Sequence, residues 1–261
     1  MARPLHDTDL RSLADASPLV VLLDVDGTLA PIAPRPEEAG VPPETIAVLH
    51  VLAARPRTHV ALVTGRVAAE ARAMVDDVEL WVVGNHGAEH LAPDGASSVD
   101  DAVAPYEGAL ARAATSLGER LGGMPGVLTE FKRWSLAVHY RLADPALVPE
   151  IEAVVREIAA REELRVASAK MVFELRPPTD VNKGTAALAL LDRFGARGDG
   201  AGALFAGDDV TDEDAFRLLR ERVPGAVTVR VGPPEVETAA GFVVDDPAAV
   251  RAMLERLAAL R

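Results

Sequence analysis

Five consecutive apolar residues, Leu19 to Leu23, end abruptly at Asp24. A run of this length predicts a strand that is buried on both faces, as in a parallel sheet. Helix and strand patterns then alternate, with a helix over 44–54, a strand over 60–63, a helix over 67–75 and a strand over 80–83. This βαβαβ order predicts an open parallel sheet with helices on its faces.

The pattern changes after the turn at 93–95. The following segments predict an antiparallel αββαββ unit: a helix over 106–121, strands over 127–132 and 135–141, a helix over 147–163, and strands over 165–167 and 171–176. The parallel pattern resumes from Lys183 and continues to Arg261. We therefore expect an α/β protein with an open, Rossmann-like parallel-sheet core from residues 1–104 and 178–261. Residues 105–177 are expected to form an inserted α+β domain.

Composition limits the possible functions. The chain has 261 residues, a net charge of −13 and 49% hydrophobic residues, which is typical of a packed globular protein with no general affinity for nucleic acid or anionic membranes. It has no cysteine, so disulfides, thiolate zinc sites and cysteine nucleophiles are excluded. The N-terminal residues lack the apolar stretch of a secretory signal, and the longest apolar run is too short to span a bilayer. We expect a cytoplasmic monomer that acts on a small molecule.

Lysine is rare in this chain. Lys132, Lys170 and Lys183 are the three lysines, and the other basic residues are arginines. A sequence that otherwise uses arginine is expected to keep lysine where a compact ammonium is needed, although three residues could also persist by chance.

The first expected strand leads directly into Asp24-Val25-Asp26-Gly27-Thr28. Two carboxylates at the end of a central strand point toward the crevice where open α/β sheets bind ligands. One could attack phosphorus while the other transfers a proton. The alternative, a turn with a capping aspartate, needs only one acid.

Two further segments predict a phosphate site. Thr64 and Gly65 end the second expected strand, where a hydroxyl and backbone N–H groups are available at a helix start, although Thr64 could instead be a simple N-cap. Lys183 lies at the start of the helix after the insertion, where it could neutralise a phosphoryl group.

Five acids lie within residues 208–214, directly after another expected strand. Thr211 to Asp214 reads as a capping box, with acids that complement the helix dipole. Asp208 and Asp209 precede the cap and are the metal candidates, because clustered carboxylates suit Mg²⁺.

Together these motifs resemble those of the haloacid dehalogenase-like phosphatases, in the same order and over the whole chain. The resemblance implies that Asp24 is the nucleophile and a Mg²⁺ ligand. It implies that Asp26 is a general acid and then a base that binds the metal through its carbonyl. Thr64 and Lys183 would hold the phosphoryl group, and Asp208 would bind the metal with support from Asp209.

Three other segments resemble the trehalose-6-phosphate phosphatases in particular: residues 84–87, 129–141 and 170–177. In a strand, Glu130 and Lys132 share one face, as do Lys170, Val172, Glu174 and Arg176. The resemblance implies that Glu130, Lys132 and Glu174 bind the sugar, whereas without it a solvated face with ion pairs is an alternative. Further substrate-binding candidates are Arg141, His86 and Asn182. His86 could equally bond to a turn backbone, and Arg66 could be a structural ion-pair partner.

The expected activity is hydrolysis of trehalose 6-phosphate with Mg²⁺ through an aspartyl phosphate. Two alternatives remain. A related phosphatase would act on sucrose 6-phosphate or a mannosyl phosphoglycerate with the same chemistry. A non-catalytic sugar-phosphate sensor could do without Asp26 or the acids of 208–214, all of which are present here.

Overall fold

The computed structural model describes residues 2–33, 35, 38–76, 80–169 and 171–261. The chain divides into two compact units, Met1–Ser98 with Val181–Arg261, and Val99–Asp180. The second unit contains the whole segment 105–177 and extends beyond it at both ends.

A nine-stranded sheet forms the middle of the first unit in the described part of the chain, in the order β1-β13-β12-β11-β2-β3-β4-β5-β6. Its strands are β1 (Arg3–Pro4), β2 (Leu19–Leu23), β3 (Thr58–Val63), β4 (Trp81–Gly84), β5 (Glu89–Leu91), β6 (Ser97–Val99), β11 (Gly202–Gly207), β12 (Val227–Val231) and β13 (Phe242–Val244). The pairs from β1 to β4 are parallel, whereas β5 runs antiparallel to β4. The central position of β2 explains why all five of its residues are buried.

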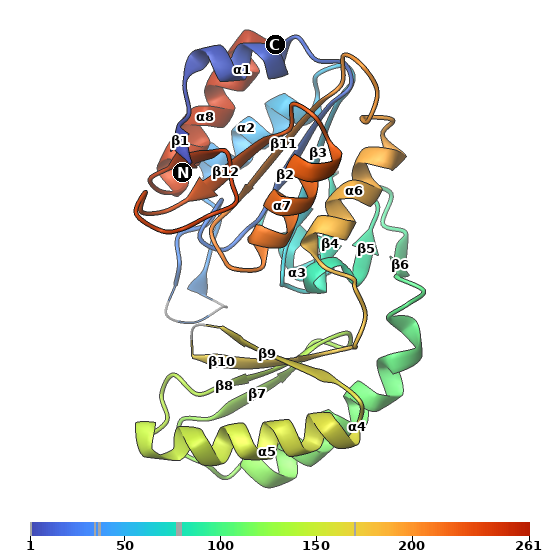
Figure 1. The fold of residues 1–261 in the computed structure, drawn as a ribbon, viewed down its shortest axis with the longest axis vertical. Helices are drawn as coiled ribbons and strands as arrows, with labels where there is room; N and C mark the ends of the chain where they lie inside the picture. The colour runs from blue at the N-terminus through green and yellow to red at the C-terminus, as the bar shows by residue number, and fades with distance from the viewer. Residues whose placement is uncertain (1, 34, 36–37, 77–79, 170) are drawn as a thin grey trace. The chain divides into compact units, whose positions relative to one another are not determined.

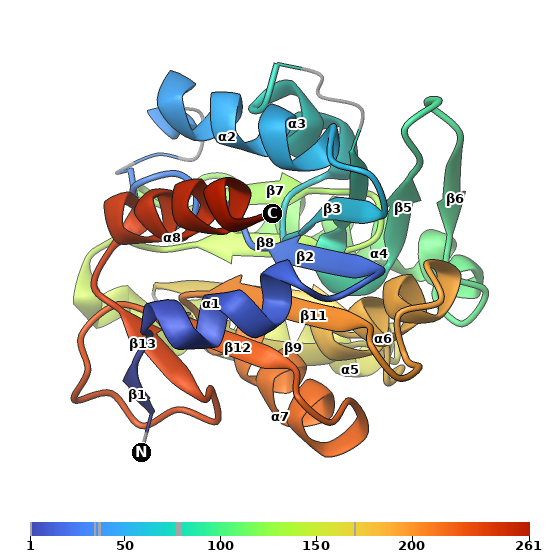
Figure 2. The same ribbon diagram turned by 90° about the horizontal axis from the view of Figure 1, so that it is seen from above.

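Helices cover both faces of this sheet (Figures 1 and 2). One face packs against α1 (Asp7–Ala14), α2 (Pro43–Ala53), α3 (Ala68–Ala73) and α8 (Pro247–Leu260), and the other against α6 (Lys183–Arg193) and α7 (Asp212–Arg222). Alternate residues of β2 serve the two layers: Leu19, Val21 and Leu23 face the first, and Val20 and Leu22 face the second. Because side chains alternate between the two faces, this period also determines on which face each residue at the carboxyl end of β2 lies.

The described residues of the second unit form a four-stranded antiparallel sheet, in the order β7-β8-β10-β9, with two helices. Its elements are α4 (Glu107–Leu121), β7 (Leu128–Phe131), β8 (Leu136–His139), α5 (Val148–Arg161), β9 (Arg165–Ala169) and β10 (Val172–Arg176). Leu136, Val138, Phe173 and Leu175 pack with α4 and α5. Their neighbours along the strands, including Glu174, therefore lie on the opposite face of the sheet.

The predicted architecture, a parallel core interrupted by an αββαββ insertion, is confirmed. The last helix, α8, begins after Asp246, whose side chain accepts a hydrogen bond from the Ala249 N–H, and Pro247 is the first helical residue. Sequence analysis predicted no element before Leu19 and so missed β1 and α1. The buried residues of α1 are Leu10 and Leu13, too few to show a helical period.

Short 3₁₀ turns lie at Asn85–Gly87, Ala104–Tyr106 and Pro145–Leu147. Within the described ranges, no helix combines the length and the apolar character that crossing a membrane requires.

Candidate active site

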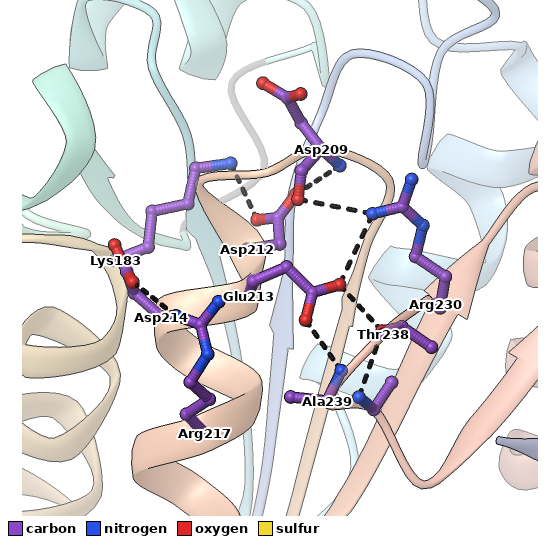
Figure 3. Close-up of polar contacts among 10 residues, drawn as sticks. Lys183, Asp209, Asp212, Glu213, Asp214, Arg217, Arg230, Thr238 and Ala239 are labelled. Carbon is purple, nitrogen blue, oxygen red and sulfur yellow. Dashed lines mark hydrogen bonds and ion pairs between the residues drawn. The ribbon is translucent and has the colours of Figure 1, made fainter. Parts of the chain in front are cut away.

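A buried lysine between two buried aspartates forms the centre of the site. The Lys183 side chain is 2% exposed, and its Nζ atom lies 2.9 Å from Asp24 Oδ1 and 2.7 Å from Asp212 Oδ1. Asp24 directly follows β2, Lys183 begins α6 and Asp212 begins α7. Figure 3 shows the lysine reaching from its helix toward Asp212. Segments far apart in the sequence thus converge at the carboxyl ends of the parallel strands, as their positions predict.

Negative charge exceeds positive charge in this cluster. Burial raises the pKa of Asp24 well above its ordinary value and also raises the pKa of Asp212, while Lys183 opposes both changes. Burial raises the pKa of Asp208 to about 7, and the carboxylates of Asp212 and Asp209 add to the rise. Burial lowers the pKa of Lys183, but Asp212 and Asp24 outweigh it and raise that pKa above its ordinary value. A further positive charge would therefore stabilise the ionised carboxylates.

Three of these acids could hold a metal ion. Asp24, Asp208 and Asp212 each offer a carboxylate oxygen, and the three oxygens lie within 4.8 Å of one another. A donor set made only of oxygens suits a hard divalent cation such as Mg²⁺. The excess of negative charge fits the same cation.

This group differs from the set predicted from the sequence, which contained Asp24, Asp26, Asp208 and Asp209. The carboxylates of Asp26 and Asp209 are outside it, and Asp212 is inside it. Asp26 was predicted to bind metal through its backbone carbonyl, and that role stays a prediction. The Asp209 backbone N–H donates to Asp212 Oδ2 at 2.9 Å, so Asp209 supports the group through its main chain.

The capping box predicted at Thr211 to Asp214 is wrong. Thr211 is the N-cap of α7, but its side chain makes no capping hydrogen bond within the described residues. Its backbone is helical (φ −70°, ψ −20°), whereas a side chain that caps a helix usually requires an extended N-cap residue. Asp212 consequently bonds to Lys183 and to the Asp209 backbone instead of only complementing the helix dipole.

Asp26 lies apart from the three-carboxylate group and is held by Arg66. The guanidinium donates from Nε to Asp26 Oδ2 at 2.6 Å and from Nη2 to Oδ1 at 2.7 Å, which is a two-point ion pair. The Asp26 side chain is 37% exposed, in contrast to the buried Asp24. Arg66 thus occupies both carboxylate oxygens of Asp26 in this structure, in agreement with the ion-pair alternative for Arg66.

The predicted phosphate site is a compact turn after β3. Thr64 is buried, and its hydroxyl accepts a hydrogen bond from the Arg66 N–H at 3.2 Å. The Thr64 carbonyl accepts from the His86 N–H at 2.9 Å. Gly65 has no Cβ, and one placed there would lie 2.5 Å from the His86 ring, so a larger residue would force the ring to move. The structure therefore places His86 against Gly65. The N-cap of α3 is Val67 and not Thr64.

Asn182 begins the helix that carries Lys183. Its side-chain oxygen accepts hydrogen bonds from the backbone N–H groups of Gly184 and Thr185 at 2.8 and 3.0 Å, so it is the N-cap of α6. A Cβ on Gly87 would lie 2.8 Å from the Asn182 carbonyl oxygen. This turn thus packs closely against the start of α6. The predicted contact of Asn182 with substrate stays a prediction.

The second unit carries its own polar cluster on the sheet face away from its helices, which we call the sheet-face cluster: Glu130, Lys132, His139, Glu174 and Arg176. Glu130 Oε2 lies 3.0 Å from His139 Nε2 and 3.6 Å from Lys132 Nζ. Arg176 pairs with Glu174 two residues along the same strand. Three predicted sugar-binding residues, Glu130, Lys132 and Glu174, thus lie on one face.

Of the other two predicted residues of this unit, Arg141 is not in the cluster. Arg141 follows β8 and is exposed. Lys170 lies outside the described residues.

Comparison with known proteins defines the family. A trehalose-phosphatase family model matches residues 22–248. A trehalose-phosphate phosphatase of Mycobacterium tuberculosis is 38% identical over 239 residues, which cover 91% of this chain and 61% of that protein. The chain belongs to the trehalose-phosphatase family. It spans about three fifths of the length of the curated relatives it matches.

Solved structures agree with the family. The C-terminal domain of trehalose-6-phosphate phosphatase from Candida albicans superposes with a TM-score of 0.82 at 26% identity, over 100% of both chains. A phosphatase of the haloalkanoate (HAD) superfamily from Bacteroides thetaiotaomicron superposes with a TM-score of 0.61 at 17% identity, over 92% of this chain and 95% of that chain, and this likeness shows the fold alone. The fold predicted for the core is confirmed.

In this member of the trehalose-phosphatase family, two glycines make room for the acids of the site. A Cβ on Gly27, whose φ is +76°, would lie 2.2 Å from Asp208 Oδ2. A Cβ on Gly207 would lie 2.2 Å from Asp212 Cγ. Gly207 directly precedes Asp208 and is the one signal in the sequence that could have pointed to Asp212, because a glycine often marks close approach by another group.

Sequence analysis also missed the network that fixes the first turn of α7. Glu213 accepts hydrogen bonds from the Thr238 hydroxyl and the Ala239 N–H, both at 2.7 Å (Figure 3). Arg230 on β12 lies 3.5 Å from Glu213 Oε1 and 3.4 Å from the Asp209 carbonyl oxygen. These contacts tie the segment that carries Asp208, Asp209 and Asp212 to the neighbouring strand.

Proposed function

We propose that the chain hydrolyses trehalose 6-phosphate to trehalose and phosphate through a phosphorylated Asp24. The observation that carries the proposal is the Asp24 carboxylate, which is buried at the sheet edge 2.9 Å from Lys183 and shares an acidic cluster suited to a divalent cation. The activities for which the relatives and the Candida albicans domain are named support the choice of substrate. The assignment of Mg²⁺ as the cation is part of the proposal.

Asp24 performs the first step. Its carboxylate oxygen forms a bond to phosphorus as the bond from phosphorus to the sugar oxygen breaks, which gives an acyl phosphate. Lys183, Thr64 and the Gly65 N–H stabilise the phosphoryl oxygens. Asp24, Asp208 and Asp212 would hold Mg²⁺, with the Asp26 carbonyl and Asp209 as predicted contributors. Bound there, the cation supplies charge neutralisation for the acids and the phosphoryl group.

Asp26 transfers the protons. It gives a proton to the departing sugar oxygen, then removes one from the water that cleaves the acyl phosphate and restores Asp24. A carboxylate that accepts from Arg66 at both oxygens carries no proton to donate, so the pair with Arg66 has to open before the first step. The ion pair is therefore the resting arrangement of Asp26 in this proposal.

Three residues of the sheet-face cluster bind the sugar. Glu130, Lys132 and Glu174 offer acceptors and donors that match sugar hydroxyls, which both donate and accept hydrogen bonds. Residues 105–177 accordingly form the substrate-specificity domain of a monomeric enzyme. Arg141, His86 and Asn182 are the further candidates for contact with the substrate.

A panel of sugar phosphates tests the proposal. Phosphate release is measured from trehalose 6-phosphate, sucrose 6-phosphate, mannosyl-3-phosphoglycerate and p-nitrophenyl phosphate, each with Mg²⁺ and with EDTA. We expect a strong preference for trehalose 6-phosphate and loss of activity with EDTA. Preference for another sugar would keep the chemistry and change the substrate, whereas binding of trehalose 6-phosphate without turnover would indicate a sensor.

A further inference from the structure

The strand register of the second unit places two carboxylates on either side of an alanine. Ala137 on β8 is the direct partner of Glu130 on β7 and of Glu174 on β10. Direct partners on adjacent strands share a face, and adjacent strands lie about 4.8 Å apart. Glu130 and Glu174 are therefore separated by two strand spacings, with a small side chain between them.

His139 approaches one of these carboxylates from the side. It is two residues beyond Ala137 on β8, so it is the diagonal neighbour of Glu130 across the strand pair. Its Nε2 atom lies 3.0 Å from Glu130 Oε2. The hydrogen bond from His139 lowers the pKa of Glu130 below its ordinary value despite burial, and Lys132 lowers it further. Glu130 is thus ionised at neutral pH, and the His139 Nε2–H donates.

Both contacts to Glu130 use the same oxygen. The His139 Nε2 atom lies 3.0 Å from Oε2, and the approach of Lys132 Nζ is to the same oxygen, which means that Oε2 is held from two sides, at 3.0 and 3.6 Å. A glutamate on a strand has three side-chain torsions, and holding Oε2 from two directions restricts them and fixes where Oε1 points. A fixed acceptor binds a hydroxyl better than one that must be ordered on binding.

We infer that His139 is a positioning residue for sugar recognition, holding Glu130 so that Oε1 accepts a hydrogen bond from a sugar hydroxyl beside Ala137. The inference rests on the proposed function, since it requires a sugar phosphate as substrate. It adds to that function a residue that touches no substrate atom and acts through Glu130. A cross-strand pair with only a structural role would leave sugar recognition unaffected.

Two variants of nearly equal size test the role. His139→Gln keeps an N–H near the position of Nε2, and His139→Leu removes it. The ratio of kcat/KM for trehalose 6-phosphate to kcat/KM for p-nitrophenyl phosphate, which has no sugar, is measured for both. We expect this ratio to fall about tenfold in His139→Leu, mainly through KM for the sugar phosphate, which is the scale of one hydrogen bond to a charged group. His139→Gln should stay within about twofold of the wild type on the same scale.

A double-mutant cycle shows whether His139 acts through Glu130. In the Glu130→Gln background, His139→Leu should cause little additional loss. An unchanged ratio in His139→Leu, equal losses in the Leu and Gln variants, or a full additional loss in the Glu130→Gln background would each overturn the inference. If thermal unfolding shows that His139→Leu is not folded, His139→Asn replaces it, because the asparagine amide is too short to reach Oε2.

The result for the wild type distinguishes failure of the proposed function from failure of the inference about His139. If the wild type prefers another sugar phosphate, trehalose 6-phosphate is the wrong substrate, and the same ratio is measured with the preferred sugar. If the wild type hydrolyses no sugar phosphate, the proposed function and the inference both fail. If the wild type behaves as proposed and the ratio does not change, only the inference fails.

Discussion

The buried cluster of the core and the sheet-face cluster of the second unit use the same kinds of side chain in opposite electrostatic states. In the core, burial dominates and raises the pKa of Asp24, Asp208 and Asp212. In the sheet-face cluster, the hydrogen bond from His139 outweighs burial and lowers the pKa of Glu130. The core site is short of positive charge, which suits it to a cation, whereas the sheet-face cluster contains its own cations and suits a neutral sugar.

The largest expected difference between the two regions concerns turnover. Asp24→Asn removes the proposed nucleophile and should reduce kcat at least about 10⁴-fold with every substrate. Glu130→Gln, the matched change in the second unit, should leave hydrolysis of p-nitrophenyl phosphate close to that of the wild type. Circular dichroism checks that both variants are folded. Ordinary phosphate release by Asp24→Asn would contradict the roles given to the two regions.

The second difference concerns stability. Lys183→Met leaves carboxylates buried without their cation and should lower the free energy of unfolding by about 3–5 kcal/mol without metal. Lys132→Met affects a more exposed pair, with side chains 16% and 33% exposed, and should cost less than about 1 kcal/mol. Urea denaturation of both variants at pH 8 measures the two values. Similar losses of unfolding free energy in the two variants would show that burial does not distinguish the buried cluster of the core from the sheet-face cluster.

The third difference concerns substrate preference. Glu174→Gln should reduce kcat/KM for trehalose 6-phosphate by about 10- to 100-fold, because a hydrogen bond to a charged acceptor is lost. Its effect on p-nitrophenyl phosphate should be much smaller. Parallel assays with the two substrates give the comparison. Equal losses of kcat/KM with both substrates would show that Glu174 contributes to the stability of the second unit and not to sugar binding.

The smallest expected effect concerns pH and the cation. Asp208 has its pKa raised to about 7, so it holds a proton below that pH and must lose it to bind Mg²⁺. Mg²⁺ binding, measured by calorimetry, should therefore be about tenfold weaker at pH 6 than at pH 8. Equal affinity at the two pH values would remove Asp208 from the site.

The raised pKa of Asp208 also affects the stability of the metal-free protein. Whereas Mg²⁺ binding should strengthen as the pH rises, this contribution to stability should weaken. The folded state holds this proton more tightly than the unfolded state does. The contribution of Asp208 to stability is therefore greatest at low pH and is lost as the pH rises toward about 7. Added Mg²⁺ should restore stability above that pH.

Local patterns predicted the fold well because buried strands and amphipathic helices carry their period in the sequence. They also predicted that Asp24, Lys183 and Asp208 meet, since the carboxyl ends of parallel strands lie at one edge of a sheet. They did not predict the pairing of Asp26 with Arg66, because a resting ion pair depends on which of several nearby charges a side chain selects.

Two other residues show where such reasoning stops. Asp212 matched a capping motif, and its different role is visible only in the structure, where the Thr211 backbone is helical and Asp212 bonds to Lys183. His139 meets Glu130 as a diagonal neighbour, which depends on a register that alternating residues alone do not define. The roles of Asp212 and His139 both depend on contacts between segments that are distant in the sequence.

The covalent step is the central claim, and Asp26→Asn with p-nitrophenyl phosphate tests it most directly. This leaving group departs without a proton, so the first step should proceed while the second, which needs Asp26 as base, is slowed. The account predicts a burst of one p-nitrophenol per chain in Mg²⁺, with phosphate located on Asp24 by mass spectrometry of the acid-quenched protein. Continued release of free phosphate with no phosphorylated Asp24, or phosphate on another residue, would contradict it.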